Sequence, residues 1–249
     1  MPIYIKSSGE IRKIREAGKI VAEVLRMIEE RIRVGVSLID LEKFCDLLIQ
    51  KRGGIPAFKG YKGFPAAVCI SLNEEIVHGI PDGRRLKEGD IVKVDVGVIK
   101  DGYFADGAKT YTLGKLEGRV KELIKVTASA LLLGIKEARA GKRVGDISAA
   151  IQREVERAGF SVVRELTGHG VGIELHEEPI IPNFGKKGEG VLLKSGMTLA
   201  IEPMVNMGSP ETETLKNGWT VITKDRLPSC HFEHTVLVTE DEPEILTDG

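Results

Sequence analysis

Five residues between positions 95 and 233 carry side chains suited to binding metal ions: Asp95, Asp106, His169, Glu202 and Glu233. They supply four carboxylates and one imidazole. An oxygen-rich set with a single nitrogen suits a pair of hard or borderline divalent cations, with cobalt, manganese, iron and zinc as candidates. A protein-bound metal pair activates water, which is the chemistry of hydrolysis. The sequence therefore predicts a dinuclear metal site and a metal-dependent hydrolase.

Two of these carboxylates lie in a hairpin predicted over residues 91–113. Valines at alternate positions from 92 to 98 give the period of a strand with two faces. Asp101-Gly102 is a two-residue turn of the kind that hairpins favour. In the register that this turn sets, Asp95 and Asp106 are diagonal neighbours on one face, roughly 7–8 Å apart. That separation fits two ions about 3.5–4 Å apart. We expect Asp101 to be solvated and Asp95 to be buried, where a carboxylate needs a partner such as a metal.

The other three candidate ligands lie in glycine-rich or strand-like segments. His169 is the second residue of Gly-His-Gly-Val-Gly, whose glycines allow the backbone to approach a ligand closely. Glu202 follows an apolar run and precedes Pro203, at a predicted strand end. Glu233 lies in an alternating strand over 231–238 and shares a face with His231. A salt bridge is the ordinary explanation for any one Glu, so the argument depends on the whole set.

The elements that must position these residues appear twice along the chain. Helical periodicity predicts one helix over apolar positions 14–32 and a second from about Leu38 to Lys51, followed by strand signals. Displaced by 106 positions, Gly35 meets Gly141, Asp40 meets Asp146 and Gly53 meets Gly159. Chance similarity between two helix pairs is the alternative explanation. We predict an α+β fold with an internal pseudo-twofold repeat, in a single catalytic domain over 1–249 with halves of about 8–115 and 116–249.

Composition narrows the functional class. The 249 residues include 36 basic and 37 acidic ones, a net charge of -1 that argues against broad binding to nucleic acid or anionic membranes. A basic cluster of Lys6, Arg12, Lys13 and Arg15 is expected to be a solvated helix face rather than an RNA contact.

The start of the sequence lacks the pattern of a secretory signal, and no apolar segment reaches membrane-spanning length. Three cysteines without Cys-x-x-Cys spacing are expected to be free thiols, and the protein to be cytoplasmic.

Several motifs together are similar to those of the type I methionine aminopeptidases, in order and over nearly the whole chain. They are Asn73-Glu74, His78-Gly79-Ile80-Pro81, Val94-Asp95-Val96-Gly97 with Asp106, Gly168-His169-Gly170-Val171-Gly172, His176-Glu177-Glu178-Pro179, Ile201-Glu202-Pro203-Met204 and Phe232-Glu233-His234-Thr235. The resemblance implies a pita-bread fold, with a central antiparallel curved sheet flanked by helices. It also implies a metallo-exopeptidase that removes the initiator methionine from the amino terminus of nascent proteins, as a monomer in transient contact with the ribosome.

The resemblance further implies a role for each site residue. Asp95 would bind one metal, Asp106 and Glu233 would bridge both, and His169 with Glu202 would complete the other. His78 and His176 match two catalytic histidines that contact substrate without binding metal, and Glu202 would also accept and pass on a proton. The residues that match the lining of the methionine pocket are Tyr61, Phe64, Cys69, Leu175 and Trp219.

Three positions depart from the usual family pattern. Gly107 stands where Thr is common, Leu175 where an aromatic residue is common, and His231 where Gln is frequent. These departures leave the metal affinity and the detailed substrate specificity open. The sequence also does not determine the physiological metal, the number of bound ions or the residue preferred after methionine.

Three related proteins are less consistent with the sequence. A type II enzyme would carry a helical insertion between the later ligands, whereas only 26 positions separate His176 from Glu202. A same-fold X-Pro peptidase would be expected to carry an extra amino-terminal domain before the first core helix. A non-catalytic relative that binds ribosomes or nucleic acid would be expected to have replaced at least one ligand.

Overall fold

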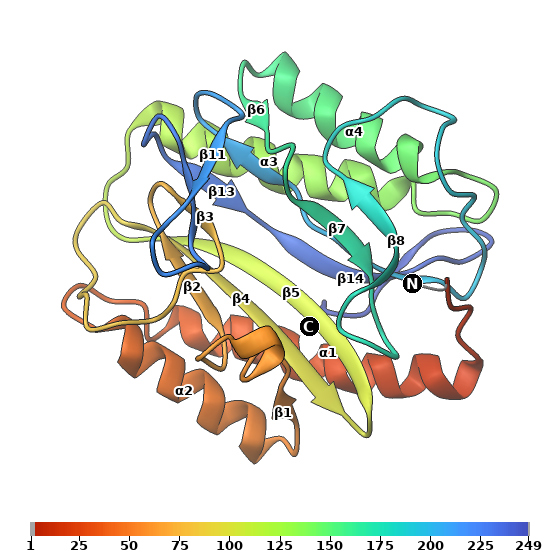
Figure 1. Cartoon of the computed structure of the whole chain (residues 1–249), viewed down its shortest axis with the longest axis horizontal. Helices are drawn as coiled ribbons and strands as arrows, with labels where there is room; N and C mark the ends of the chain where they lie inside the picture. The colour runs from red at the N-terminus through yellow and green to blue at the C-terminus, as the bar shows by residue number, and fades with distance from the viewer. Residues whose placement is uncertain (1–2, 249) are drawn as a thin grey trace.

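Two helix pairs lie outside a central antiparallel sheet in the computed structural model, which describes residues 3–248 (Figure 1). Helices α1 (Ser8–Glu29) and α2 (Leu38–Lys51) lie below the sheet in this view, and α3 (Gly118–Lys136) and α4 (Val144–Arg157) lie above it. Each pair covers its own apolar core, one against the first half of the sheet and one against the second. The fold class expected from the sequence is confirmed.

The central sheet has the order β1-β4-β5-β14-β9-β7-β8, with β2 also paired to β4 and β15 to β14. Its strands are β1 (Ile55–Pro56), β2 (Cys69–Leu72), β4 (Ile91–Lys100), β5 (Tyr103–Thr112), β7 (Thr167–Gly170), β8 (Glu177–Pro182), β9 (Thr198–Ile201), β14 (Glu233–Leu237) and β15 (Glu244–Ile245). One small sheet joins β13 (Ser229–His231), β10 (Met204–Asn206) and β6 (Ser161–Val162). Another joins β11 (Thr212–Thr214), β12 (Val221–Thr223) and β3 (Glu75–Val77).

The internal repeat is visible in the helices and their ends. Helix α4 covers the positions of α2 displaced by 106 residues. The turn before each of these helices has a left-handed glycine, Gly35 at φ 88° and Gly141 at φ 85°. The turn after each helix has another, Gly53 at φ 70° and Gly159 at φ 73°. Because glycine adopts positive φ without a Cβ clash, these repeated spacings reflect two copies of the same helix-turn geometry.

The hairpin formed by β4 and β5 has the predicted register. Asp95 pairs with Ala108 and Gly97 pairs with Asp106, which makes the two aspartates diagonal neighbours. The turn residues Asp101 and Gly102 have φ of 49° and 79°, the pair of positive values that a two-residue hairpin turn needs, and both are exposed. The hairpin therefore delivers both carboxylates to one face of the sheet.

The expectation of a solvated basic cluster near the amino terminus is wrong at Lys6. The chain passes beside β8 there, and the Lys6 ammonium is buried and hydrogen-bonded to the Glu177 carboxylate. The second oxygen of Glu177 accepts the backbone N–H groups of Ile173 (2.6 Å) and Glu174 (3.0 Å). This buried pair thus holds the loop before β8, which carries Leu175 and His176. A buried ion pair cannot touch ribosomal RNA.

The packing of α1 on the carboxyl-terminal segment gives a test of the fold. A Cβ added at Gly18 would lie 2.1 Å from the carbonyl oxygen of Leu246, so Gly18→Ala must displace backbone. We expect this substitution to lower the free energy of unfolding by about 1–3 kcal/mol in urea denaturation. The matched control is Gly118→Ala in α3, where a Cβ meets nothing within 4 Å and the helix should be unchanged or slightly stabilised. Equal stability of the two variants would contradict the described contact.

Candidate active site

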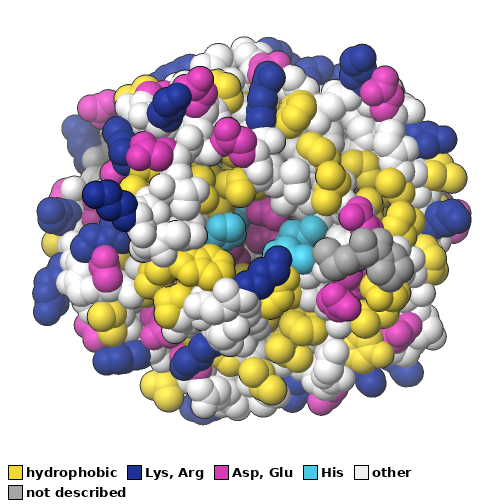
Figure 2. Space-filling view, viewed as in Figure 1, with side chains coloured by type: hydrophobic (Ala, Val, Ile, Leu, Met, Phe, Trp, Pro, Cys, Tyr) yellow, Lys and Arg dark blue, Asp and Glu magenta, His cyan; other side chains and the backbone are white. Residues whose placement is uncertain are grey.

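One pocket opens at the centre of the molecule, between the two halves. Figure 2 shows a hollow with an acidic floor and histidines on its sides. All twelve site residues predicted from the sequence line this pocket, although they come from distant parts of the chain. Phe58 and Lys62 complete its lining. The structure brings the candidate residues together, while their individual roles stay predictions.

Four strands and the residue directly after a fifth supply the candidate metal ligands. Asp95 lies in β4, Asp106 in β5, Glu233 at the start of β14 and His169 in β7. Glu202 directly follows β9. Because β4, β5, β14, β9 and β7 are consecutive neighbours in the central sheet, their side chains on one face converge above it.

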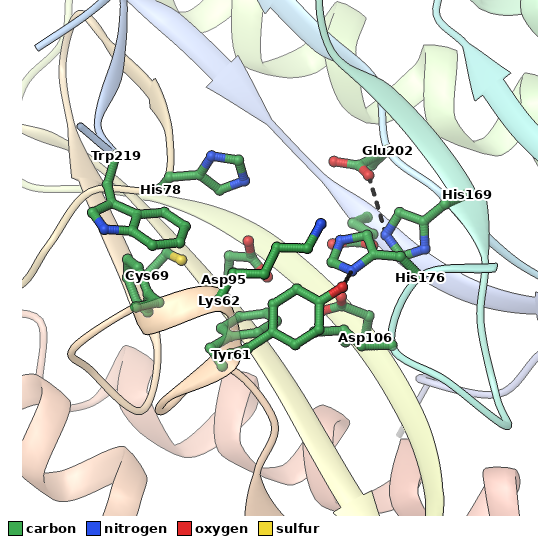
Figure 3. A pocket seen from close by; sticks show the side chains of 14 residues that line it. Tyr61, Lys62, Cys69, His78, Asp95, Asp106, His169, His176, Glu202 and Trp219 are labelled. Carbon is green, nitrogen blue, oxygen red and sulfur yellow. Dashed lines mark hydrogen bonds and ion pairs between the residues drawn. The ribbon is translucent and has the colours of Figure 1, made fainter. Parts of the chain in front are cut away.

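Distances in this group fit the binding of cations. Asp106, His169 and Glu233 each offer a ligand atom within 4.8 Å of the others, and so do Glu202, His231 and Glu233. Glu202 Oε1 lies 3.6 Å from His169 Nε2 (Figure 3). His169 Nδ1 lies 2.9 Å from the carbonyl oxygen of Gly170, which can only accept a hydrogen bond. Nδ1 therefore carries the ring hydrogen, and Nε2 keeps a lone pair for a metal.

The electrostatics of the carboxylates also favour cations. Burial, followed by the charges of neighbouring carboxylates, raises the pKa of Asp95, Glu202 and Glu233 well above their ordinary values. Burial raises the pKa of Asp106 to about 7. Asp95 Oδ1 and Glu233 Oε1 are buried, and within residues 3–248 neither has a hydrogen-bond partner. Four carboxylates close together, two of them with a buried oxygen that has no partner, are unfavourable without cations, so these residues fit divalent metal ions.

Two histidines stand above this floor on opposite sides (Figure 3). His78 follows β3 with a left-handed φ of 57°, and burial lowers its pKa. Burial also lowers the pKa of His176 to about 3, so this imidazole is neutral. His176 Nδ1 lies 2.9 Å from the Tyr61 hydroxyl. A hydroxyl that donates to Nδ1 leaves the ring hydrogen on Nε2, available to a substrate oxygen.

One wall of the pocket is apolar. Phe64 and Trp219 meet edge to face with ring centroids 5.2 Å apart, and Cys69 and Leu175 are buried in the same cluster. Burial raises the pKa of Cys69 well above its ordinary value, so the side chain is a thiol that packs as a small apolar group. Such a wall accommodates a flexible aliphatic or thioether side chain.

Sequence reasoning missed two residues that line the pocket. Phe58 lies against Gly97, where an added Cβ would be 2.5 Å from the Phe58 ring. A glycine inside strand β4 could therefore have indicated that another group packs closely against the strand at this point. Lys62 lies in a tight turn with a left-handed φ of 49° and extends across the pocket mouth (Figure 3). No pattern in the sequence marked Lys62.

The departure at Gly107 is compensated by the backbone. A Cβ at this position would lie 3.0 Å from Val21 of α1, on the packed side of the sheet. The Gly107 N–H donates to Asp106 Oδ1 (3.0 Å), and the Asp106 N–H donates to the Thr235 hydroxyl (2.9 Å). The first bond orients the Asp106 carboxylate and the second fixes the Asp106 backbone, both without a hydroxyl at position 107.

Comparisons with known proteins agree with this site. The sequence profile of the metallopeptidase family M24 matches residues 12–240. The chain is 46% identical to the methionine aminopeptidase of Clostridium perfringens over 245 residues, covering 98% of each chain. It is 48% identical to methionine aminopeptidase 1 of Bacillus subtilis, covering 98% of this chain and 99% of that one. The crystal structure of methionine aminopeptidase from Thermotoga maritima superposes with a TM-score of 0.98 at 48% identity over the full length of both chains.

A pita-bread fold with a carboxylate and imidazole centre defines a metal-dependent peptidase. The chain belongs to the metallopeptidase family M24 and, within it, to the methionine aminopeptidases. The predicted family and enzyme class are thereby confirmed. A prolidase from Pyrococcus furiosus also superposes, with a TM-score of 0.81, but at 24% identity this likeness shows the shared fold alone, and the chain covers 65% of that protein.

Proposed function

We propose that this protein removes the initiator methionine from nascent proteins by hydrolysing their first peptide bond. The observation that carries the proposal is the position of an apolar wall beside a buried carboxylate cluster in one pocket. The cluster suits the ions that activate water, and the wall suits the methionine side chain. The group of relatives at 46–48% identity supports the same activity.

The residues of the pocket can divide the reaction between them. Two divalent ions, held by Asp95, Asp106, His169, Glu202 and Glu233, would supply water of lowered pKa and a positive charge beside the scissile carbonyl. Glu202 accepts a proton from the attacking water and returns it to the leaving amine. His176 donates its Nε2 hydrogen to the oxygen on which negative charge develops, while Tyr61 keeps the ring in that tautomer. His78 contacts the amide side from across the pocket.

We also propose a domain organisation, a location and a choice of metals for the protein as a whole. The chain acts as a single catalytic domain, with its site between halves of about 8–115 and 116–249. It works as a monomer in the cytoplasm, with transient ribosome contact, and cobalt, manganese, iron or zinc fills the site according to availability. No helix within residues 3–248 combines the length and apolar character needed to cross a bilayer.

The test is release of free methionine from a Met-Ala-Ser peptide by metal-free protein, before and after manganese or cobalt is added. We expect no release without metal, release with it, and none of the first residue from an X-Pro peptide. Cleavage of the X-Pro peptide would favour the alternative peptidase of this fold. No release with any metal from folded protein would favour a non-catalytic binding function.

The apolar wall can be tested separately from the metal centre. Trp219→Ala removes the ring that packs against Phe64, and we expect kcat/KM for Met-Ala-Ser to fall about 10–100-fold. Manganese affinity measured by calorimetry should stay unchanged, because Trp219 belongs to the apolar cluster rather than to the carboxylate groups. Replacing Cys69 should likewise alter methionine preference more than metal content. Loss of metal binding in either variant would contradict this separation.

A further inference from the structure

His231 is a buried histidine at the metal centre whose ring has no role in the proposed reaction. It is the last residue of β13 and is 1% exposed. Its backbone is fixed, because its N–H donates to the Thr110 hydroxyl (3.2 Å) and that hydroxyl donates to its carbonyl oxygen (2.5 Å). Neither ring nitrogen has a hydrogen-bond partner in the part of the chain that the structure describes. Buried polar groups nearly always have a binding partner, so the two ring nitrogens of His231 need an explanation.

The ring of His231 is directed at Glu202. His231 Nε2 lies 3.2 Å from Glu202 Oε2, and His169 Nε2 lies 3.6 Å from Glu202 Oε1. Glu202 thus lies between two imidazoles, one beside each carboxylate oxygen. Two donor atoms that are each about 2.1 Å from one ion, at an angle of about 90–110°, are themselves about 3.0–3.4 Å apart. The 3.2 Å separation between His231 and Glu202 matches a pair of ligands on a common ion.

Glu233 supplies a third ligand at the same place. Glu202, His231 and Glu233 each offer a ligand atom within 4.8 Å of the others. Glu233 Oε1 is buried and has no hydrogen-bond partner within residues 3–248, like the ring nitrogens of His231. Two carboxylates and one imidazole form a coordination set for zinc, cobalt or manganese.

We propose that His231 is a sixth ligand of the metal centre, which with Glu202 and Glu233 holds a divalent cation. The inference rests on the proposed metal-dependent function, and it adds a second imidazole to a centre for which the family resemblance supplies one. Asp106, His169 and Glu233 form the neighbouring group, so Glu233 is shared between two imidazole-containing positions. The additional nitrogen should favour borderline cations such as zinc and cobalt over harder ones.

The test is an NMR titration of metal-free protein, labelled with 15N in its histidine rings, with zinc alone. The chain has five histidines, so the ring resonances can be assigned by single substitutions. We expect two imidazoles to move to metal-bound positions, one missing from the spectrum of His169→Gln and the other from that of His231→Gln. His234 is the internal control, because it lies next to Glu233 on the opposite face of β14, where its Nδ1 is 2.9 Å from the Thr247 hydroxyl. Its resonance should not move.

The variants separate a ligand from a mere hydrogen-bond donor. Glutamine at 231 can still donate to Glu202 but offers no ring nitrogen, so zinc affinity by calorimetry should fall about tenfold or more in His231→Gln. The His169→Gln protein should still show one zinc-bound imidazole. The inference is overturned if only the His169 ring moves in the unsubstituted protein, or if His169→Gln shows none. If zinc moves neither ring, the proposed metal centre fails together with it.

Discussion

Glu202→Gln is expected to lower kcat/KM for Met-Ala-Ser about 10³-fold or more at saturating manganese. Glu202 is assigned two tasks, binding metal and transferring the proton of the attacking water, and loss of a general base alone costs about 10²–10⁴-fold. Glutamine keeps the size of the side chain and one coordinating oxygen, but it cannot accept the proton. The effect should therefore appear mainly in kcat, with a smaller change in KM.

The experiment compares steady-state kinetics with metal content. Inductively coupled plasma analysis of the manganese-loaded variant separates loss of metal from loss of proton transfer. Glu213→Gln in β11 is the matched control, since its carboxylate pairs with Arg226 on the surface and should leave turnover unchanged. If Glu202→Gln kept activity within tenfold of the unsubstituted enzyme, the assigned role of the carboxylate would be wrong.

The periodicity of apolar residues was sufficient to predict those parts of the fold that depend on residues close together in the sequence. The alternating valines and the Asp101-Gly102 turn determined the register that makes Asp95 and Asp106 diagonal neighbours. Glycines at matching positions revealed the repeated helix pair, because their positive φ is a local requirement. The residue types indicated a metal site, but its assembly could be inferred only through the motif set, since no spacing along the chain shows that β4 and β7 belong to one sheet.

Contacts between distant segments could not be predicted from the sequence. Lys6 looked like part of a solvated helix face, yet it lies before α1 and is buried against Glu177, 171 positions away. Tyr61 was predicted as pocket lining, whereas its hydroxyl also meets His176, 115 positions away. The single strand predicted over 231–238 is wrong: β13 ends at His231, and β14 begins at Glu233 in a different sheet. The approach of His231 to Glu202 depends on the pairing of β13 with β10, which the sequence pattern does not show.

The carboxylate cluster should also make the metal-free protein less stable as pH rises. The folded-state pKa of Asp106 is about 7, against an ordinary value of 3.8 that applies in the unfolded chain. Between these values the folded protein binds more protons than the unfolded one, so the free energy of unfolding falls as pH increases. One pKa unit corresponds to about 1.4 kcal/mol, so the contribution of Asp106 amounts to about 4 kcal/mol, present below pH 4 and lost above pH 7. The raised pKa values of Asp95, Glu202 and Glu233 act in the same direction.

Asp106→Asn removes this contribution together with the charge of Asp106, which helps to raise the pKa of Asp95, Glu202 and Glu233. In metal-free urea denaturation, we expect Asp106→Asn to be the more stable protein at pH 8 and the advantage to disappear below pH 4. Manganese at 100 times its dissociation constant should then stabilise the unsubstituted protein by about 2.7 kcal/mol at pH 8. The variant, which lacks a predicted bridging ligand, should gain much less. A metal-free Asp106→Asn protein that is the less stable one at pH 8 would show that the buried Asp106 carboxylate does not destabilise the fold. The buried carboxylates of the pocket would then not lower the free energy of unfolding, in contrast to the usual trade-off between stability and function at active sites.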